Sequence, residues 1–160
     1  MTTTPFVPEG FEPPGGLSTP RFVLEPLGPQ HNERDYAAWT SSVEHIHATP
    51  GFIESEWPHE MTLAENQADL ERHERDFGGR TGFTYTVLDP GDGDVVGCLY
   101  IYPLKDGPGA QVTSWVRAGR AELDAPLAEA VAAWLEDAWP FERVRYLGRP
   151  SLSRSDPPAP

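Results

Sequence analysis

The chain has 160 residues, and its 25 acidic and 12 basic side chains give a formal net charge of −13. A surface this acidic repels nucleic-acid phosphates and anionic lipids, which argues against binding to nucleic acid or to a membrane. The single cysteine, Cys98, excludes an intrachain disulfide and a cysteine-rich zinc site. The N-terminal segment lacks the basic and apolar regions of a secretory signal, and no apolar run reaches about 18 residues, so we expect a cytoplasmic protein.

The length fits one folded domain with an irregular segment at each end. Residues 1–20 are rich in proline and glycine and carry a few irregularly spaced apolar side chains, which predicts an extended N-terminal arm. Residues 149–160 contain proline, serine and only one large apolar side chain, Leu152, which predicts a flexible C-terminal tail. The folded domain is therefore expected over residues 21–148.

The first half of the domain shows the periodicities of one strand and two helices. A short apolar segment at 21–27 predicts a strand, and apolar side chains at three- and four-residue steps over 36–46 predict a helix. A second helix is expected over about 62–77. Thr62 and Glu65 have the spacing of a capping box at its start, and a pair of glycines follows its end.

The second half is richer in strands. The segments 81–89 and 94–104 contain β-branched and aromatic residues and flank a Pro-Gly-Asp-Gly turn, which is typical of a hairpin. A third strand is expected over 110–117, a helix capped by Asp124 follows, and 142–148 predicts a last strand. The order β-α-α-β-β-β-α-β predicts an α/β domain with a mixed central sheet and helices on both faces.

This order of elements, together with three segments, resembles the GNAT superfamily of acyltransferases. Residues 22–39 resemble its first strand and the start of its first helix, 93–104 its third strand, and 114–139 its fourth strand with the following turn and helix. The resemblance covers roughly residues 21–148. It implies the GNAT fold and transfer of an acyl group from acyl-CoA to an amine.

The resemblance also implies a position for the cofactor. In the superfamily the fourth and fifth strands splay apart around the pantetheine arm, and the turn after the fourth strand binds the pyrophosphate at a helix N-terminus. Carried onto this sequence, acetyl-CoA would contact Trp115, Val116, Arg117, Gly119 and Arg120.

The same turn departs from the family pattern, in which an Arg or Gln is followed after two residues by Gly, any residue, and Gly or Ala. Glu122 and Asp124 stand where the small residues are usual. Each carboxylate would repel a phosphate by on the order of 1 to 4 kcal/mol at ~4 Å, and Asp124 as N-cap would occupy an amide that the phosphate needs. Two interpretations remain: Arg117 and Arg120 bind phosphate through their side chains, or they are solvated loop charges.

Ser114 and Tyr146, on the two strands that flank the expected opening, are the candidates for catalysis, although ordinary strand positions explain them as well. The superfamily often carries a tyrosine general acid on a helix after its fifth strand. No such helix fits into residues 147–160, so the domain is a shortened form of the fold. We therefore expect the N-terminal arm, or a second chain in a homodimer, to cover the last strand.

The segment 51–61 borders the acceptor site in the superfamily. Its Trp57, His59 and Glu60 would suit recognition of an amine; alternatively, Trp57 and Phe52 fill the core while the charged residues face water.

No metal site is expected. His45 and His47 are two residues apart and diverge on a helix, and the HExxH motif is absent. Two hypotheses for the function follow. The first is an acyl-CoA-dependent N-acyltransferase that acts on an unidentified small-molecule or peptide amine. The alternative is a catalytically degenerate GNAT-like module for binding or assembly that no longer uses CoA.

Overall fold

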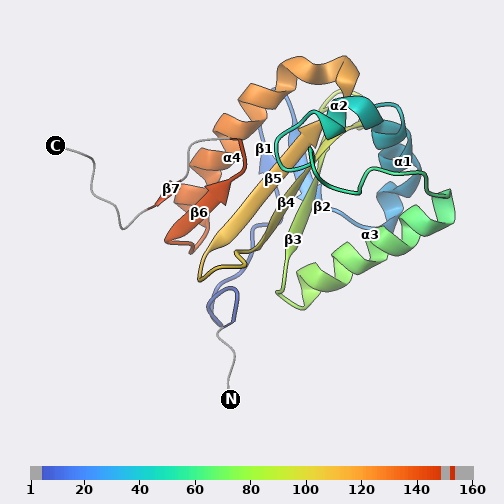
Figure 1. Ribbon diagram of the computed structural model, residues 1–160. Coiled ribbons are helices and arrows are strands. Elements are labelled where there is room, and N and C mark those ends of the chain that lie inside the picture. Colours follow the sequence, from blue (N-terminus) through green and yellow to red (C-terminus); the bar gives the residue numbers. More distant parts are fainter. Residues whose placement is uncertain (1–4, 149–151, 154–160) are drawn as a thin grey trace.

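The computed structural model describes residues 5–148 and 152–153, and its centre is a seven-stranded sheet (Figure 1). The strands lie in the sheet in chain order: β1 (Leu17–Ser18), β2 (Val23–Pro26), β3 (Phe83–Leu88), β4 (Val95–Pro103), β5 (Ala110–Val116), β6 (Arg143–Tyr146) and β7 (Leu152–Ser153). All neighbouring pairs are antiparallel except β5 and β6, which are parallel. The predicted mixed sheet is confirmed.

Helices cover both faces of this sheet, as predicted. The helical elements are η1 (Pro29–His31), α1 (Asn32–Thr40), α2 (Val43–His47), α3 (Leu63–Gly78), η2 (Ala118–Leu123) and α4 (Asp124–Ala138). Helices α1, α2 and α3 lie on one face, and α4 lies on the other (Figure 1). Within residues 5–148, no helix has the length and apolar character needed to cross a membrane.

The helix ends follow from local chemistry, with two corrections to the prediction. The capping box of α3 is confirmed: the Glu65 amide donates to Thr62 Oγ1 at 3.1 Å, and the Thr62 amide donates to Glu65 Oε1 at 2.9 Å. The expected helix over 36–46 is two helices, because the chain leaves helical geometry at Ser42. Asp124 is not an N-cap, since η2 runs directly into α4 and leaves this residue in helical conformation.

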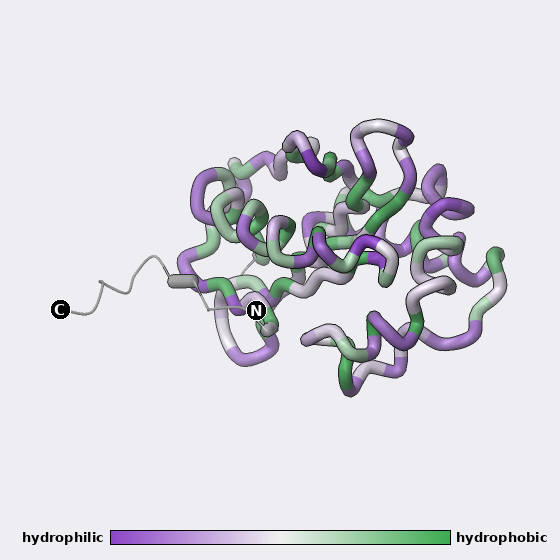
Figure 2. The backbone as a smooth tube through the Cα atoms, turned by 90° about the horizontal axis from the view of Figure 1, so that it is seen from above, coloured by the Kyte–Doolittle hydropathy of each residue, from purple (hydrophilic) through white to green (hydrophobic). Residues whose placement is uncertain are grey.

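The core is divided by the sheet into two clusters. The larger one lies between the sheet and α4, and includes Trp134 and Trp139. The smaller one lies between the sheet and helices α1 to α3, and includes Trp39 and Trp115. In Figure 2 many of the outer loops are hydrophilic (purple). Charged residues are mostly exposed in folded proteins, so a chain of high net charge is expected to have such loops.

The N-terminal arm docks on the larger cluster. The ring of Phe6 stacks on those of Phe83 and Phe141, with centroids 5.8 and 5.0 Å apart. The Arg80 guanidinium donates to the carbonyl oxygens of Pro8 and Phe11 at 2.6 and 2.7 Å. These contacts hold the arm against the end of the sheet where β3 begins.

The edge of β6 is covered by the chain's own C-terminal segment, not by the arm. Strand β7 pairs with β6 in antiparallel register, with Arg143 opposite Ser153 and Val144 opposite Leu152. The expectation that the arm covers this edge is therefore wrong for Arg143 and Val144, whereas the homodimer stays a prediction. The rest of the predicted tail, 149–151 and 154–160, lies outside the described residues.

Candidate functional site

Strands β5 and β6 separate at Thr113. Their parallel pairing ends with Val112 opposite Tyr146, and the Leu147 amide donates to the Val112 carbonyl oxygen at 3.0 Å. Beyond this point β5 continues along β4 alone as far as Val116. Strand β6 ends here, so the two parallel strands stop pairing at the place where the resemblance implies a cofactor arm.

A cavity of about 410 Å³ lies beside the end of this pairing, on the face covered by α1 to α3. Its walls combine aromatic, apolar and charged side chains: Leu27, Asp35, Phe52, Ser55, Trp57, His59, Met61, Asn66, Asp69, Leu70, Arg72, His73, Tyr100 and Thr113. The wall therefore includes the residue at which β5 leaves β6. The volume is within the range of small-molecule sites.

The loop after α2 closes the cavity against β5, and a glycine makes this possible. Gly51 has a φ of +96°, and a Cβ at this position would lie 2.7 Å from Thr113 Cγ2. A side chain would meet both a strained backbone and a steric clash. Gly51 thus allows the loop that carries Trp57 to approach the strand closely.

The floor of the cavity is a buried polar network between α1 and α3. The Asn66 amide group donates to Asn32 Oδ1 at 2.8 Å and to Asp35 Oδ2 at 3.1 Å, and it accepts from the Trp39 indole at 3.1 Å. Asp35 is only 4% exposed. Burial raises the pKa of Asp35 to about 6, against the hydrogen bond from Asn66, so the carboxyl is mostly ionised at neutral pH.

His73 forms a second buried titratable group in the cavity wall. Its Nδ1 lies 2.9 Å from Thr84 Oγ1 and 2.9 Å from the Tyr102 hydroxyl, and its Nε2 lies 3.5 Å from an Arg72 nitrogen. Burial, and then the neighbouring Arg72 charge, lower the pKa of His73 to about 4. The imidazole is neutral at pH 7, and Nε2 accepts from the guanidinium.

Neither Asp35 nor His73 was identified from the sequence. Asp35 shares a helix face with buried Ala38 and Trp39, three and four residues on, and Leu70 and His73 are three apart on α3. A polar residue at an inward-facing helical position is the signal that could have identified them.

The structure brings two of the three predicted substrate-binding residues together. Trp57 and His59 line the cavity, whereas Glu60 is exposed and is not among the lining residues. The Trp57 ring packs against Trp39 and Trp115, with centroids 5.5 and 6.0 Å apart. Trp57 therefore belongs to the core and also forms part of the cavity wall. Packing in the core and recognition of a ligand, the two alternatives from the sequence, do not exclude each other at this residue.

The predicted catalytic pair lies on the other face of the sheet. Ser114 Oγ and the Tyr146 hydroxyl are 2.5 Å apart, and both residues are 2% exposed. Ser114 is opposite Leu99, a member of the cluster beneath α4, whereas Thr113 faces the cavity. The sheet therefore separates this pair from the cavity, and a catalytic role for Ser114 and Tyr146 stays a prediction.

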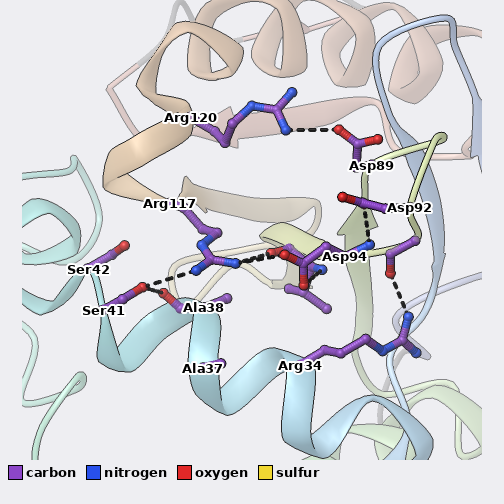
Figure 3. Close-up of polar contacts among 12 residues, drawn as sticks. Arg34, Ala37, Ala38, Ser41, Ser42, Asp89, Asp92, Asp94, Arg117 and Arg120 are labelled. Atoms are coloured by element: carbon purple, nitrogen blue, oxygen red, sulfur yellow. Dashed lines mark hydrogen bonds and ion pairs between the residues drawn. The ribbon is translucent and has the colours of Figure 1, made fainter.

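The two arginines predicted to bind phosphate are held by carboxylates of the β3–β4 hairpin (Figure 3). Arg117 donates to Asp94 Oδ2 at 3.1 Å, and Arg120 donates to Asp89 Oδ2 at 2.9 Å. The hydrogen bond from Arg120 lowers the pKa of Asp89. The arginines are therefore not free loop charges: each neutralises an aspartate of the chain itself.

The backbone of the turn is also largely engaged. The Ala118 amide donates to the buried hydroxyl of Ser42 at 2.9 Å, and the Arg120 amide donates to the Arg117 carbonyl at 2.9 Å. Gly119 has open space around it, with no heavy atom within 4 Å of the place where a Cβ would lie.

Trp115 and Val116, the remaining predicted cofactor residues, are buried. The Trp115 indole donates to the Tyr100 hydroxyl at 2.9 Å, and Val116 packs in the cluster beneath α4. Only their backbone is left to contact a cofactor. Within residues 5–148, no group of three or more His, Cys, Asp or Glu side chains is placed to hold a metal ion.

The fold is that of the GNAT acetyltransferases. A putative ribosomal-protein-serine acetyltransferase from Vibrio cholerae superimposes with a TM-score of 0.67 at 13% identity, over 84% of this chain and 74% of that one. A putative GNAT-family acetyltransferase from Bordetella pertussis gives 0.58 at 19% identity, over 81% and 75% of the two chains. The microcin C7 self-immunity acetyltransferase, solved with acetyl-CoA and AMP, gives 0.64 at 10% identity, over 82% and 72%. No protein-family model matches the sequence, and a search of curated proteins finds no match.

Proposed function

We propose that the chain is an acyl-CoA-dependent N-acyltransferase that transfers an acetyl group to a small-molecule or peptide amine in the cytoplasm. The observation that carries this proposal is the position of the cavity. Its wall contains Thr113, the residue at which β5 leaves β6. An acceptor in the cavity would therefore lie next to the point where the two strands stop pairing, which is where the resemblance implies the cofactor arm, and proximity of this kind is what group transfer requires.

Acetyl-CoA would supply an acyl group activated as a thioester. Arg117 and Arg120 would hold its pyrophosphate, since a guanidinium has five N–H donors and each of these arginines uses only some of them. The fit is conditional, because phosphate must compete with Asp94 and Asp89. These ion pairs are partly exposed, and such pairs contribute little and exchange readily.

The acceptor amine has to lose a proton when it is acylated, and the cavity wall contains two titratable groups. Asp35 is mostly ionised at neutral pH and can take a proton. His73 is neutral, but its Nε2 accepts from Arg72, so it would have to give up this contact before taking a proton. Both residues line the cavity, whereas Ser114 and Tyr146 are on the far side of the sheet.

The alternative, a GNAT-like module that no longer uses CoA, is favoured by one observation. The polar groups of the turn already have partners within the chain: Asp94 for Arg117, Asp89 for Arg120 and Ser42 for the Ala118 amide. In this case Asp94 and Asp89 of the β3–β4 hairpin would permanently occupy Arg117 and Arg120, at the place where a cofactor's phosphates would otherwise bind.

Calorimetric titration with acetyl-CoA, with desulfo-CoA and ADP as comparison ligands, separates the two proposals. We expect binding in the micromolar range, and we expect the double variant Asp89→Asn, Asp94→Asn to bind severalfold more tightly because it removes the competing carboxylates. The control is Asp106→Asn, which breaks an exposed pair of the same kind with Arg145 at 3.3 Å. If neither the parent nor the double variant binds acetyl-CoA at millimolar concentration, the enzyme proposal is refuted.

A further inference from the structure

Asp35 is a buried anion without a cationic partner in the described part of the chain. Its Oδ2 accepts from Asn66, and no nitrogen of a described Arg, Lys or His lies within 4.0 Å of the carboxylate. The side chain lines the cavity. A buried carboxylate that is ionised near neutral pH but unpaired is costly, and a cation placed beside it recovers much of that cost.

The wall around this carboxylate is aromatic. The rings of Phe52 and Trp57 have centroids 5.9 Å apart, and those of Phe52 and Tyr100 are 6.0 Å apart, with interplanar angles of 57° and 60°. All three side chains line the cavity, so a ligand inside it would contact aromatic rings. Aromatic rings bind both ammonium groups and other aromatic rings.

The other charged groups of the cavity leave it negative. Among the described residues, Arg72 is the one arginine in the wall, and it is already paired with Asp69 at 2.9 Å and with Asp76 at 3.7 Å. His73 carries no charge at pH 7, and His59 is an exposed residue. The field inside the cavity is therefore dominated by Asp35.

A further polar group in the wall lacks a partner. Trp57 Nε1 is buried and has no hydrogen-bond acceptor among the described residues. A buried donor of this kind is rare in folded proteins, and the π face of an aromatic ligand is an acceptor that would satisfy it.

We propose that the cavity binds a small primary amine carrying an aromatic ring, with the ammonium group at Asp35 and the ring among Phe52, Trp57 and Tyr100. This inference rests on the proposed function only in identifying that amine as the acyl acceptor. Binding itself requires no cofactor. The free oxygen of Asp35 accepts from the ammonium group, and the aromatic walls bury the rest of the ligand.

The test uses the full chain and two probes of nearly equal shape, 2-phenylethylamine and neutral 2-phenylethanol, titrated by calorimetry at pH 7.5 without CoA. We expect the amine to bind at least about tenfold more tightly than the alcohol. Asp35→Asn should lose about tenfold or more of the amine affinity and leave the affinity for the alcohol unchanged. Glu33→Gln, which removes an exposed carboxylate from the same helix, should change neither.

The proposal is overturned if the amine and the alcohol bind equally, if Asp35→Asn binds the amine as well as the parent, or if the amine does not bind at about 10 mM. Circular dichroism shows whether Asp35→Asn is folded. If this variant does not fold, the comparison of the amine with the alcohol in the parent chain tests the proposal.

The outcomes also separate this inference from the proposed function. Amine binding that depends on Asp35, in a chain that does not bind acetyl-CoA, supports the cation site and refutes the acyltransferase. Acetylation of an amine by a chain that binds 2-phenylethylamine and 2-phenylethanol equally supports the acyltransferase and refutes the cation site.

Discussion

Replacing Asp35 with Asn removes a buried negative charge and preserves the shape of the side chain. An Asn at this position keeps an oxygen for the hydrogen bond from Asn66. The pKa of Asp35 is raised from 3.8 to about 6, so the folded state holds the ionised form less well than the unfolded state does. A shift of roughly two units corresponds to about 3 kcal/mol of lost stability at pH 7. We therefore expect Asp35→Asn to raise the free energy of unfolding by up to about 3 kcal/mol.

In the parent, the contribution of Asp35 to stability depends on pH with a sign opposite to that of His73. Between pH 3.8 and 6 the folded state binds a proton at Asp35 that the unfolded state does not, so stability falls as the pH rises. His73 has its pKa lowered from 6.5 to about 4, so the unfolded state binds the extra proton and stability falls as the pH drops through this range. Each contribution is about 3 kcal/mol, and in the parent they nearly cancel between about pH 4 and 6.

Urea denaturation of the parent and of Asp35→Asn, in steps from pH 7.5 to 4, measures the difference directly. The difference in unfolding free energy should be largest at pH 7 and should approach zero near pH 4, which leaves the variant with the acid sensitivity contributed by His73. Glu33→Gln serves as the control, with a small difference at every pH. A difference that does not change with pH, or a variant less stable than the parent at pH 7, would show that Asp35 is not held as a costly buried anion.

Two further substitutions test the architecture of the site. Gly51→Ala places a Cβ against Thr113 at a positive φ. We therefore expect urea denaturation to show a loss of about 1–3 kcal/mol in unfolding free energy, together with weaker binding of 2-phenylethylamine. An unchanged stability would show that the loop does not need this close approach. Tyr146→Phe removes the hydrogen bond to Ser114 and should cost about 1 kcal/mol of stability. Because this pair lies across the sheet from the cavity, calorimetry should show unchanged amine binding, and a tenfold loss would contradict that placement.

The elements of the fold that were predicted correctly have local signals. The capping box at Thr62 and Glu65 acts within one turn of helix, and the β-branched and aromatic residues of β3 and β4, which flank a Gly/Asp turn, are typical of strands. Strand β7 was not predicted because Leu152 lies in a segment rich in proline and serine. It forms a strand because β6 offers an unpaired edge, which is information carried by distant residues.

The site was harder to predict from the sequence than the fold was, because its interactions join segments that are distant in the chain. Asp35 and Asn66 are 31 residues apart, and Arg120 and Asp89 are also 31 apart. A charge in the sequence gives no sign of whether tertiary packing will bury it, as at Asp35, or pair it, as at Arg120. Trp57 was chosen from the sequence because a tryptophan in a loop has few roles besides packing and recognition. It lies in the cavity wall, and its role in binding stays a prediction.

The order of the strands has a consequence for the way the molecule assembles. Strands β3, β4 and β5 are joined by short turns and form a three-stranded meander, whereas β2 and β6 are attached through long connections that contain α1 to α3 and α4. Short loops close at a smaller entropic cost than long ones, so we expect the meander to form first and the two helical layers to dock later.

The cavity lies between the meander and the layer of helices α1 to α3. One wall, with Tyr100 and Thr113, belongs to the meander, and the opposite wall, with Asp35 and His73, belongs to the layer that docks later. Separation of that layer would open the cavity while leaving the central strands paired. Local unfolding of this kind costs less than global unfolding, so exchange of ligands with solvent does not require the sheet to come apart.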